Sequence, residues 1–192
     1  MRRSDDLRRR RPSREPYPRI LIVCEGEVTE KRYFERLRHE ERIQITLEVV
    51  GGMEPKTTVE CARARKNDGF DEIWCVFDVD RHPYIREATE QAKANKFGIA
   101  ISNPCFELWV LLHFDDHTAY IDRGKLQSKC REHLPGYKKD LPCEKLFPRY
   151  PEAHKRAADL EAWQERRSTP GANPSTTVHR LVAHIKSFRA PQ

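Results

Sequence analysis

The chain has 192 residues, a net charge of +6 and 38% hydrophobic residues, which is enough for one domain with a real core. No apolar run approaches the roughly 20 residues that a membrane helix needs, and the N-terminus lacks a signal-peptide apolar region, so we expect a cytoplasmic protein without a membrane span. Six cysteines are present without a C-x-x-C pair. Cys130, His133 and Cys143 would supply only three ligands, so a structural zinc ion is not expected.

The excess positive charge is concentrated at the N-terminus. Residues 1–19 contain eight arginines against three acidic residues, and they therefore carry +5 of the net charge. Because almost no apolar side chains occur there, we expect a disordered basic tail. The run Arg8, Arg9, Arg10 and Arg11 is suited to contact with the phosphate backbone of nucleic acid. The alternative is a tail that only adds solubility.

Two short apolar runs, at residues 20–24 (ILIVC) and 73–77 (IWCVF), predict strands buried on both faces of a parallel sheet. The first run is followed by Glu25 and the second by Asp78 and Asp80, at the strand ends where α/β sheets place their chemistry. Side chains two residues apart on an extended end point the same way, so the two aspartates can bind one hard cation. The alternatives are an ordinary polar strand exit and, for Glu25, a carboxylate near a helix N-terminus.

Helices and strands are expected to alternate as far as residue 114. The pattern predicts helices over 30–38, with Thr29 as the cap, over 57–66 and over 84–95, and strands over 43–50 and 97–101. Asn103 and Pro104 then predict the start of a helix that is apolar on nearly every side except at Glu107 and His113. A buried carboxylate needs a partner or a metal, so Glu107 is a candidate site residue, whereas His113 is more typical of a core histidine.

The segment after residue 114 is predicted to be mainly helical. Helices are expected over 122–134 and 152–167, followed by an amphipathic helix marked by Val178, Leu181, Val182, Ile185 and Phe188. In the loop between the first two helices, Lys138 and Lys139 would contact nucleic acid and Tyr137 would stack on a base, unless this is an ordinary exposed loop. We therefore expect three parts: the tail at 1–19, an α/β core with a mostly parallel sheet at 20–114, and a helical extension at 115–190 packed on it.

Three carboxylates at two strand ends, with Glu107 as a fourth, predict an acidic pocket that binds Mg²⁺ or Mn²⁺. The reaction that suits such a pocket is phosphodiester cleavage. In that reaction a divalent ion activates water or the leaving oxygen, and a free carboxylate moves the proton.

Several segments resemble known families. CEGEVTEKRYF (residues 24–34) and VFDVD (76–80) are similar to the two signatures of the Toprim domain, which topoisomerases, bacterial primases and OLD-type nucleases share. With SNPCFELWVLLHF (102–114), PGYKK (135–139) and NPSTTVHRLV (173–182), most of the chain after residue 19 resembles the RloB-like proteins of bacterial defence loci. The resemblance implies a Rossmann-like Toprim fold, a nuclease that acts in defence against phage or abortive infection, and a partner ATPase encoded nearby.

The resemblance also assigns roles to residues. Glu25 would be the general acid/base carboxylate or a shared metal ligand, and Asp78 and Asp80 would be metal ligands. OLD-type nucleases also carry an acidic residue early in the helix that follows the Glu-Gly turn. Glu30 is its nearest match here, but it lies one residue farther from that turn than in those nucleases. Lys138 or Lys139 would supply a positive group for the transition state.

Two other functions compete with a nuclease. An apolar strand followed by D-x-D also suggests a HAD-like phosphatase or a nucleotide-sugar transferase. A HAD phosphatase usually carries its nucleophilic aspartate on the first strand, whereas here a Glu-Gly strand precedes the D-x-D strand. The other alternative is a non-catalytic module that binds nucleic acid or an ATPase. The near-neutral charge outside the tail favours the module, and the three core carboxylates favour an enzyme.

Overall fold

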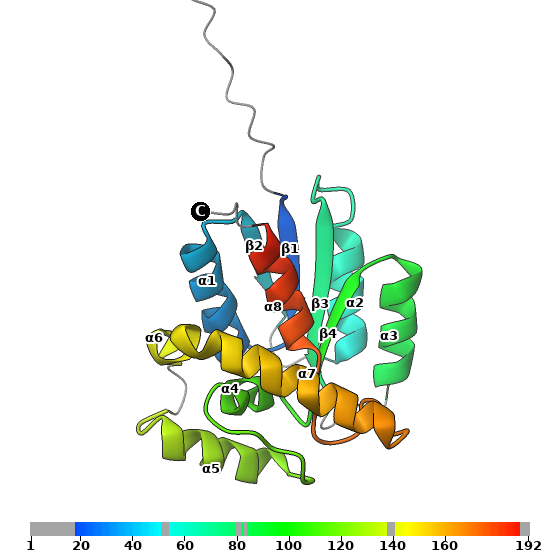
Figure 1. Ribbon diagram of the computed structural model, residues 1–192. Coiled ribbons are helices and arrows are strands. Elements are labelled where there is room, and N and C mark those ends of the chain that lie inside the picture. The colour runs from blue at the N-terminus through cyan, green and yellow to red at the C-terminus, as the bar shows by residue number, and fades with distance from the viewer. Residues whose placement is uncertain (1–17, 51–53, 80–81, 83, 138–140, 189–192) are drawn as a thin grey trace, which may run out of the picture.

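The computed structural model describes residues 18–50, 54–79, 82, 84–137 and 141–188, and it has a central sheet with helices on both faces (Figure 1). The sheet has five strands in the order β2-β1-β3-β4-β5, of which the first four are parallel and β5 is antiparallel to β4. The strands are β1 (Ile20–Cys24), β2 (Ile45–Val49), β3 (Glu72–Asp78), β4 (Gly98–Asn103) and β5 (Ser175–Thr176). The predicted α/β, Rossmann-like fold with a mostly parallel sheet is confirmed.

The eight α-helices of the described residues divide between the two faces of the sheet. They are α1 (Thr29–Glu41), α2 (Pro55–Ala64), α3 (Ile85–Ala94), α4 (Glu107–Leu112), α5 (Arg123–His133), α6 (Cys143–Leu146), α7 (Tyr150–Arg166) and α8 (Val178–Ser187), and a 3-10 turn (Phe147–Arg149) precedes α7. Figure 1 shows α2 and α3 on one face, and α1 and α8 on the other, where α7 crosses beneath them. No helix in the described ranges is both long and apolar enough to cross a membrane.

Strand β1 supplies both hydrophobic cores because its alternate side chains point to opposite faces of the sheet. Leu21 and Val23 belong to the cluster that packs against α2 and α3. Ile20 and Ile22 belong to a larger cluster that includes Trp109 of α4 and the apolar faces of α1, α5, α7 and α8. All five residues of β1 are buried, which explains why the sequence of this strand does not alternate.

The C-terminal segment contributes to the sheet itself. Ser102 of β4 pairs with Thr176 of β5, and their hydroxyl oxygens lie 3.0 Å apart. This strand was not predicted, because two polar residues carry no periodic signal. The division into a core at 20–114 and an extension at 115–190 remains a prediction, but the extension supplies both an edge strand and a helix that covers one face.

The predicted helix start at Asn103 and Pro104 is wrong. Asn103 is the last residue of β4, the Asn103–Pro104 peptide bond is cis, and α4 begins only at Glu107. Asn103 is held in the sheet by its pairing with Ser175, and its side-chain Nδ2 donates to the Gly171 carbonyl at 2.9 Å. These contacts with residues far along the chain override the local signal for a helix start.

Candidate acidic site

Two predicted site residues emerge at the same edge of the sheet, at the carboxyl ends of β1 and β3. The two strands are parallel neighbours with Cys24 opposite Val76, so Glu25 follows the end of β1 close to Asp78, the last residue of β3. Helices α4 and α5 lie beyond this edge (Figure 1). The edge is therefore the place where residues from two strands and two helices can meet.

Glu30 reaches this edge because Gly26 has no side chain. Glu30 is in the first turn of α1, and its carboxylate folds back over Gly26. A Cβ atom at position 26 would lie 1.9 Å from the Glu30 Cδ atom, which is far inside any permitted contact. The Glu-Gly turn thus makes room for a second carboxylate, which explains why this position requires glycine.

Glu107 is the first residue of α4 and points toward the same region. The Gln127 side-chain Nε2 donates to Glu107 Oε1 at 3.3 Å, and the Cys130 thiol donates to the Glu107 carbonyl oxygen at 3.3 Å. Both partners belong to α5. Glu107, Glu30 and Asp78 are each only 7% exposed, so three carboxylates are buried within one part of the molecule.

The carboxylates act on one another electrostatically. Burial raises the pKa of Glu25 to about 8, and the neighbouring Glu30 adds to this rise. Burial likewise raises the pKa of Glu30 to about 7, with a further contribution from Glu107. The pKa of Asp78 lies well above its ordinary value, because of burial first and then because of Glu30, Glu107 and Glu25. Such a pocket holds its full negative charge only when a cation is present.

Arg123 provides one such positive charge. Its Nη2 atom donates to Asp78 Oδ2 at 3.0 Å, and its charge opposes the rise in pKa of Glu25, Glu30 and Asp78. Arg123 is the first residue of α5, whose N-terminus is capped by Asp122 accepting from the Lys125 backbone N–H at 2.9 Å. Sequence reasoning missed this arginine, because no local motif links it to a strand end 45 residues earlier.

The donor set suits a hard divalent ion in chemistry and charge, although the described residues do not form a ready-made metal site. Carboxylate oxygens are the ligands that Mg²⁺ and Mn²⁺ prefer. Glu25 Oε1 is buried without a hydrogen-bond partner in the described part of the chain, and Glu25 Oε2 lies 3.6 Å from His82 Nε2. Across the described ranges, however, no three His, Cys, Asp or Glu side chains form a group that could hold a metal ion.

A protein-family model with the description "RloB-like protein" matches residues 20–185, from the start of β1 almost to the end of α8. The chain belongs to the RloB-like protein family. No curated protein and no solved structure gives a significant match. The family match includes Glu25, Glu30, Asp78 and Glu107 as well as Arg123. The resemblance drawn from the five sequence segments is therefore confirmed at the level of the family.

Several predicted residues of this RloB-like chain lie outside the described residues. These are Asp80, Lys138, Lys139, Arg8, Arg9, Arg10 and Arg11. The structure consequently brings together Glu25, Glu30, Asp78 and Glu107, whereas the predicted metal role of Asp80 and the predicted nucleic-acid contacts of the lysines and arginines remain predictions.

Tyr137 does not suit base stacking, which was one of the two alternatives for its loop. Tyr137 is buried, and its hydroxyl lies 2.9 Å from Thr29 Oγ1 at the start of α1. The tyrosine therefore ties the end of the α5 segment to the helix that carries Glu30, and its ring is not available to solvent. His113 is a buried core residue, as expected, with Nδ1 donating to the Trp109 carbonyl at 2.8 Å.

Proposed function

We propose that this RloB-like protein is a nuclease of the Toprim type, which hydrolyses phosphodiester bonds of DNA or RNA with the help of Mg²⁺ or Mn²⁺. The observation that carries the proposal is the gathering of four carboxylates, from the end of β1 and from α1, β3 and α4, at one sheet edge, where Glu25, Glu30 and Glu107 each raise the pKa of a neighbouring carboxyl group. Buried carboxylates that repel one another do not stabilise a fold, so this arrangement favours a role in binding cations.

The residues divide into a ligand group and a supporting group. Glu25 and Asp78 would hold the ion, together with Asp80, and the ion would supply polarisation of the phosphate and activation of water. Glu25 also accepts or returns the proton, since one of its oxygens has no hydrogen-bond partner among the described residues. Glu30 and Glu107 lie beside them and set the charge of the pocket.

Family membership supports a role associated with defence. We propose that the nuclease acts against phage infection, including by abortive infection, and that an ATPase encoded nearby is its partner. Cleavage of a nucleic acid shared by phage and host would account for the need to control it through such a partner.

The first test is cleavage by the purified protein. Plasmid DNA, single-stranded DNA and tRNA are incubated with Mg²⁺ or Mn²⁺, with EDTA controls. We expect cleavage of at least one substrate, and we expect Asp78→Ala to reduce it at least a hundredfold while leaving the melting temperature close to that of wild type. Asp159→Ala is the matched control, because Asp159 is an exposed residue of α7 that is paired only with Lys155 among the described residues.

The second candidate function is a non-catalytic module that binds nucleic acid or an ATPase. It is favoured by the lack of a ready-made metal site among the described residues. Titration calorimetry with Mn²⁺ separates the two functions. Binding heat that disappears in Asp78→Ala supports the nuclease, whereas no heat with the wild-type protein, together with nucleic-acid binding that Asp78→Ala leaves unchanged, establishes the module.

A further inference from the structure

We propose that Arg123 is an exchangeable cation: its guanidinium neutralises Asp78 when no metal is bound, and it moves to a substrate phosphate when a divalent ion takes its place. The inference deepens the proposed nuclease function and rests on it. It assigns a substrate-binding role to a residue outside the strand ends that carry the acidic site.

Arg123 is more exposed than the carboxylate that it contacts. Its side chain is 38% exposed, whereas the Asp78 side chain to which it donates is only 10% exposed. The guanidinium therefore lies between a buried carboxylate and solvent.

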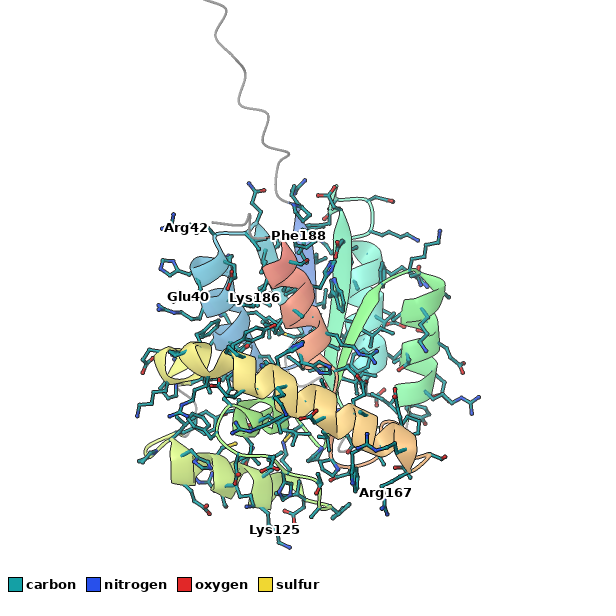
Figure 2. The ribbon with its side chains drawn as sticks, in the orientation of Figure 1. Glu40, Arg42, Lys125, Arg167, Lys186 and Phe188 are labelled. Atoms are coloured by element: carbon teal, nitrogen blue, oxygen red, sulfur yellow. The ribbon has the colours of Figure 1, made fainter. Side chains whose placement is uncertain are left out.

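Helix α5 holds the backbone of Arg123 in place, and the side chain extends from it to Asp78. Leu126 and Cys130 are buried against the core, and Gln127, one turn after Arg123, donates to Glu107. Lys125 lies on the opposite side of the helix, directed away from the sheet (Figure 2). The backbone of α5 is thus fixed by one face, and the long arginine side chain is the part that can change partners.

Charge balance explains why the exchange would occur. A divalent ion bound by Asp78 would weaken the hydrogen bond from the guanidinium to Oδ2, because the two positive charges would repel each other. The incoming nucleic acid supplies a phosphate charge as a new partner. A guanidinium is well matched to phosphate, since its planar fork donates two parallel hydrogen bonds. The phosphate thus offsets part of the positive charge that the divalent ion adds to the site.

The competing interpretation is that Arg123 only fixes Asp78 in place for the metal. The two interpretations predict opposite effects on metal affinity. If Arg123 competes with the ion for Asp78, its removal strengthens metal binding. If it only orients Asp78, its removal weakens metal binding, because the carboxylate is then less well positioned.

The first measurement is titration calorimetry with Mn²⁺ on the full chain. We expect Arg123→Met to bind Mn²⁺ roughly threefold to tenfold more tightly than wild type, and Arg123→Lys to behave like wild type. Arg131→Met is the matched control on the same helix, because Arg131 is exposed and its Nη2 donates only to Ser128 among the described contacts. It should leave Mn²⁺ affinity unchanged.

The second measurement is the salt dependence of binding to a labelled single-stranded 20-mer, with EDTA or with Ca²⁺ as an oxygen-seeking substitute for Mn²⁺. Each phosphate contact contributes about 0.7 to the slope of log K against log salt for single strands. Arg123→Met should reduce this slope by about 0.7 in Ca²⁺ and leave it unchanged in EDTA. Arg123→Lys should restore most of the slope, which a purely structural role of Arg123 does not predict.

The outcomes are distinguishable. Weaker Mn²⁺ binding by Arg123→Met, or an equal loss of slope in EDTA and in Ca²⁺, overturns the exchange and leaves the nuclease proposal intact. No Mn²⁺ binding by wild type overturns both. Tighter Mn²⁺ binding together with a slope that falls only in Ca²⁺ establishes the exchange.

Discussion

At the residue scale, Gly26 is the position where the acidic site depends on the absence of a side chain. Gly26→Ala would place a methyl group on the Glu30 carboxylate and force that side chain away from the strand ends. We expect Mn²⁺ affinity to fall about tenfold, because the pocket loses one of its negative charges. Titration calorimetry measures this loss. Unchanged affinity would show that Glu30 does not contribute to cation binding.

Gly124→Ala is the matched control for this substitution. A Cβ atom at Gly124 would lie 3.4 Å from Asp122 Oδ1, which is an ordinary contact, and the residue is inside α5. Alanine is a better helix former than glycine, so we expect the free energy of unfolding to rise by about 0.5–1 kcal/mol. Urea denaturation checks this, and Mn²⁺ affinity should not change.

His113 makes stability depend on pH. Burial lowers the pKa of His113 to about 4, and in the unfolded chain histidine has a pKa near 6.5. Between these two pH values the unfolded state binds a proton that the folded state does not. The contribution of His113 to the free energy of unfolding is therefore fully present above pH 6.5, and it is lost as the pH falls toward 4. The loss over this window is roughly 3 kcal/mol.

The test is urea denaturation at several pH values. His113→Gln cannot take up the proton, so its free energy of unfolding should fall less steeply between pH 6.5 and 4.5 than that of wild type. His39→Gln is the control, because His39 is exposed on α1 and should keep the wild-type slope. Parallel slopes for wild type and His113→Gln would contradict the prediction.

The sequence pattern predicted the carboxylates of the site, but it did not predict Arg123, which is the positive group beside them. Glu25 and Asp78 follow apolar runs and Glu107 lies in an otherwise apolar helix, and each of these is a signal within a few residues. Arg123 stands in a polar segment like many other arginines of the chain. Its contact with Asp78 exists only once the chain has folded, so no pattern around it could have indicated the role.

At the element scale, Gln164 of α7 fixes the loop that leads into β5. Its Nε2 donates to the carbonyl oxygens of Ala172 and Pro174, at 2.6 Å and 2.5 Å, and its Oε1 accepts from the Gly171 N–H at 3.1 Å. Because this side chain is buried, Gln164→Ala leaves three backbone groups without their partner. We expect a loss of about 2 kcal/mol in urea denaturation.

Gln91→Ala is the control for this change, since Gln91 is exposed on α3 and should alter stability by less than about 0.5 kcal/mol. Hydrogen exchange locates the effect. The amide of Thr177, which donates to the Ile101 carbonyl, should exchange faster in Gln164→Ala than in wild type. Equal exchange would mean that the loop is held in place without Gln164.

Several elements were predictable because their sequence patterns are local. The unalternating runs of β1 and β3 and the amphipathic pattern of α8 are read within ten residues or fewer. The start of α4 and the presence of β5 were not predicted, since both depend on the pairing of Asn103 with Ser175, 72 positions later by residue number. Local sequence signals fail where a contact between distant segments determines the backbone conformation.

At the scale of the whole molecule, α8 completes the cover of one sheet face. Val178, Leu181, Val182 and Ile185 are fully buried in the same cluster as Ile20 and Ile22 of β1. Burying four such side chains contributes roughly 6–12 kcal/mol, which is comparable to the whole stability of a domain. A chain that ends at residue 174 should therefore show no cooperative urea transition and no near-UV circular dichroism.

A chain that lacks residues 1–17 is the control, because it keeps every contact described above, and it should unfold like the full chain. A cooperative transition in the chain that ends at residue 174 would show that the sheet is stable without β5 and α8. This experiment also tests the predicted division between a core at 20–114 and an extension at 115–190. A core that folds by itself must still fold when the residues after 174 are removed.

The order of these parts along the chain has a consequence for synthesis. A ribosome releases the segments with Glu25, Asp78 and Glu107 first, the segment with Arg123 later, and the covering helix α8 last. Until α8 has emerged, the sheet lacks the helix that completes the cover of one face. The nuclease proposed above would thereby be inert while it is still attached to a machine made of RNA.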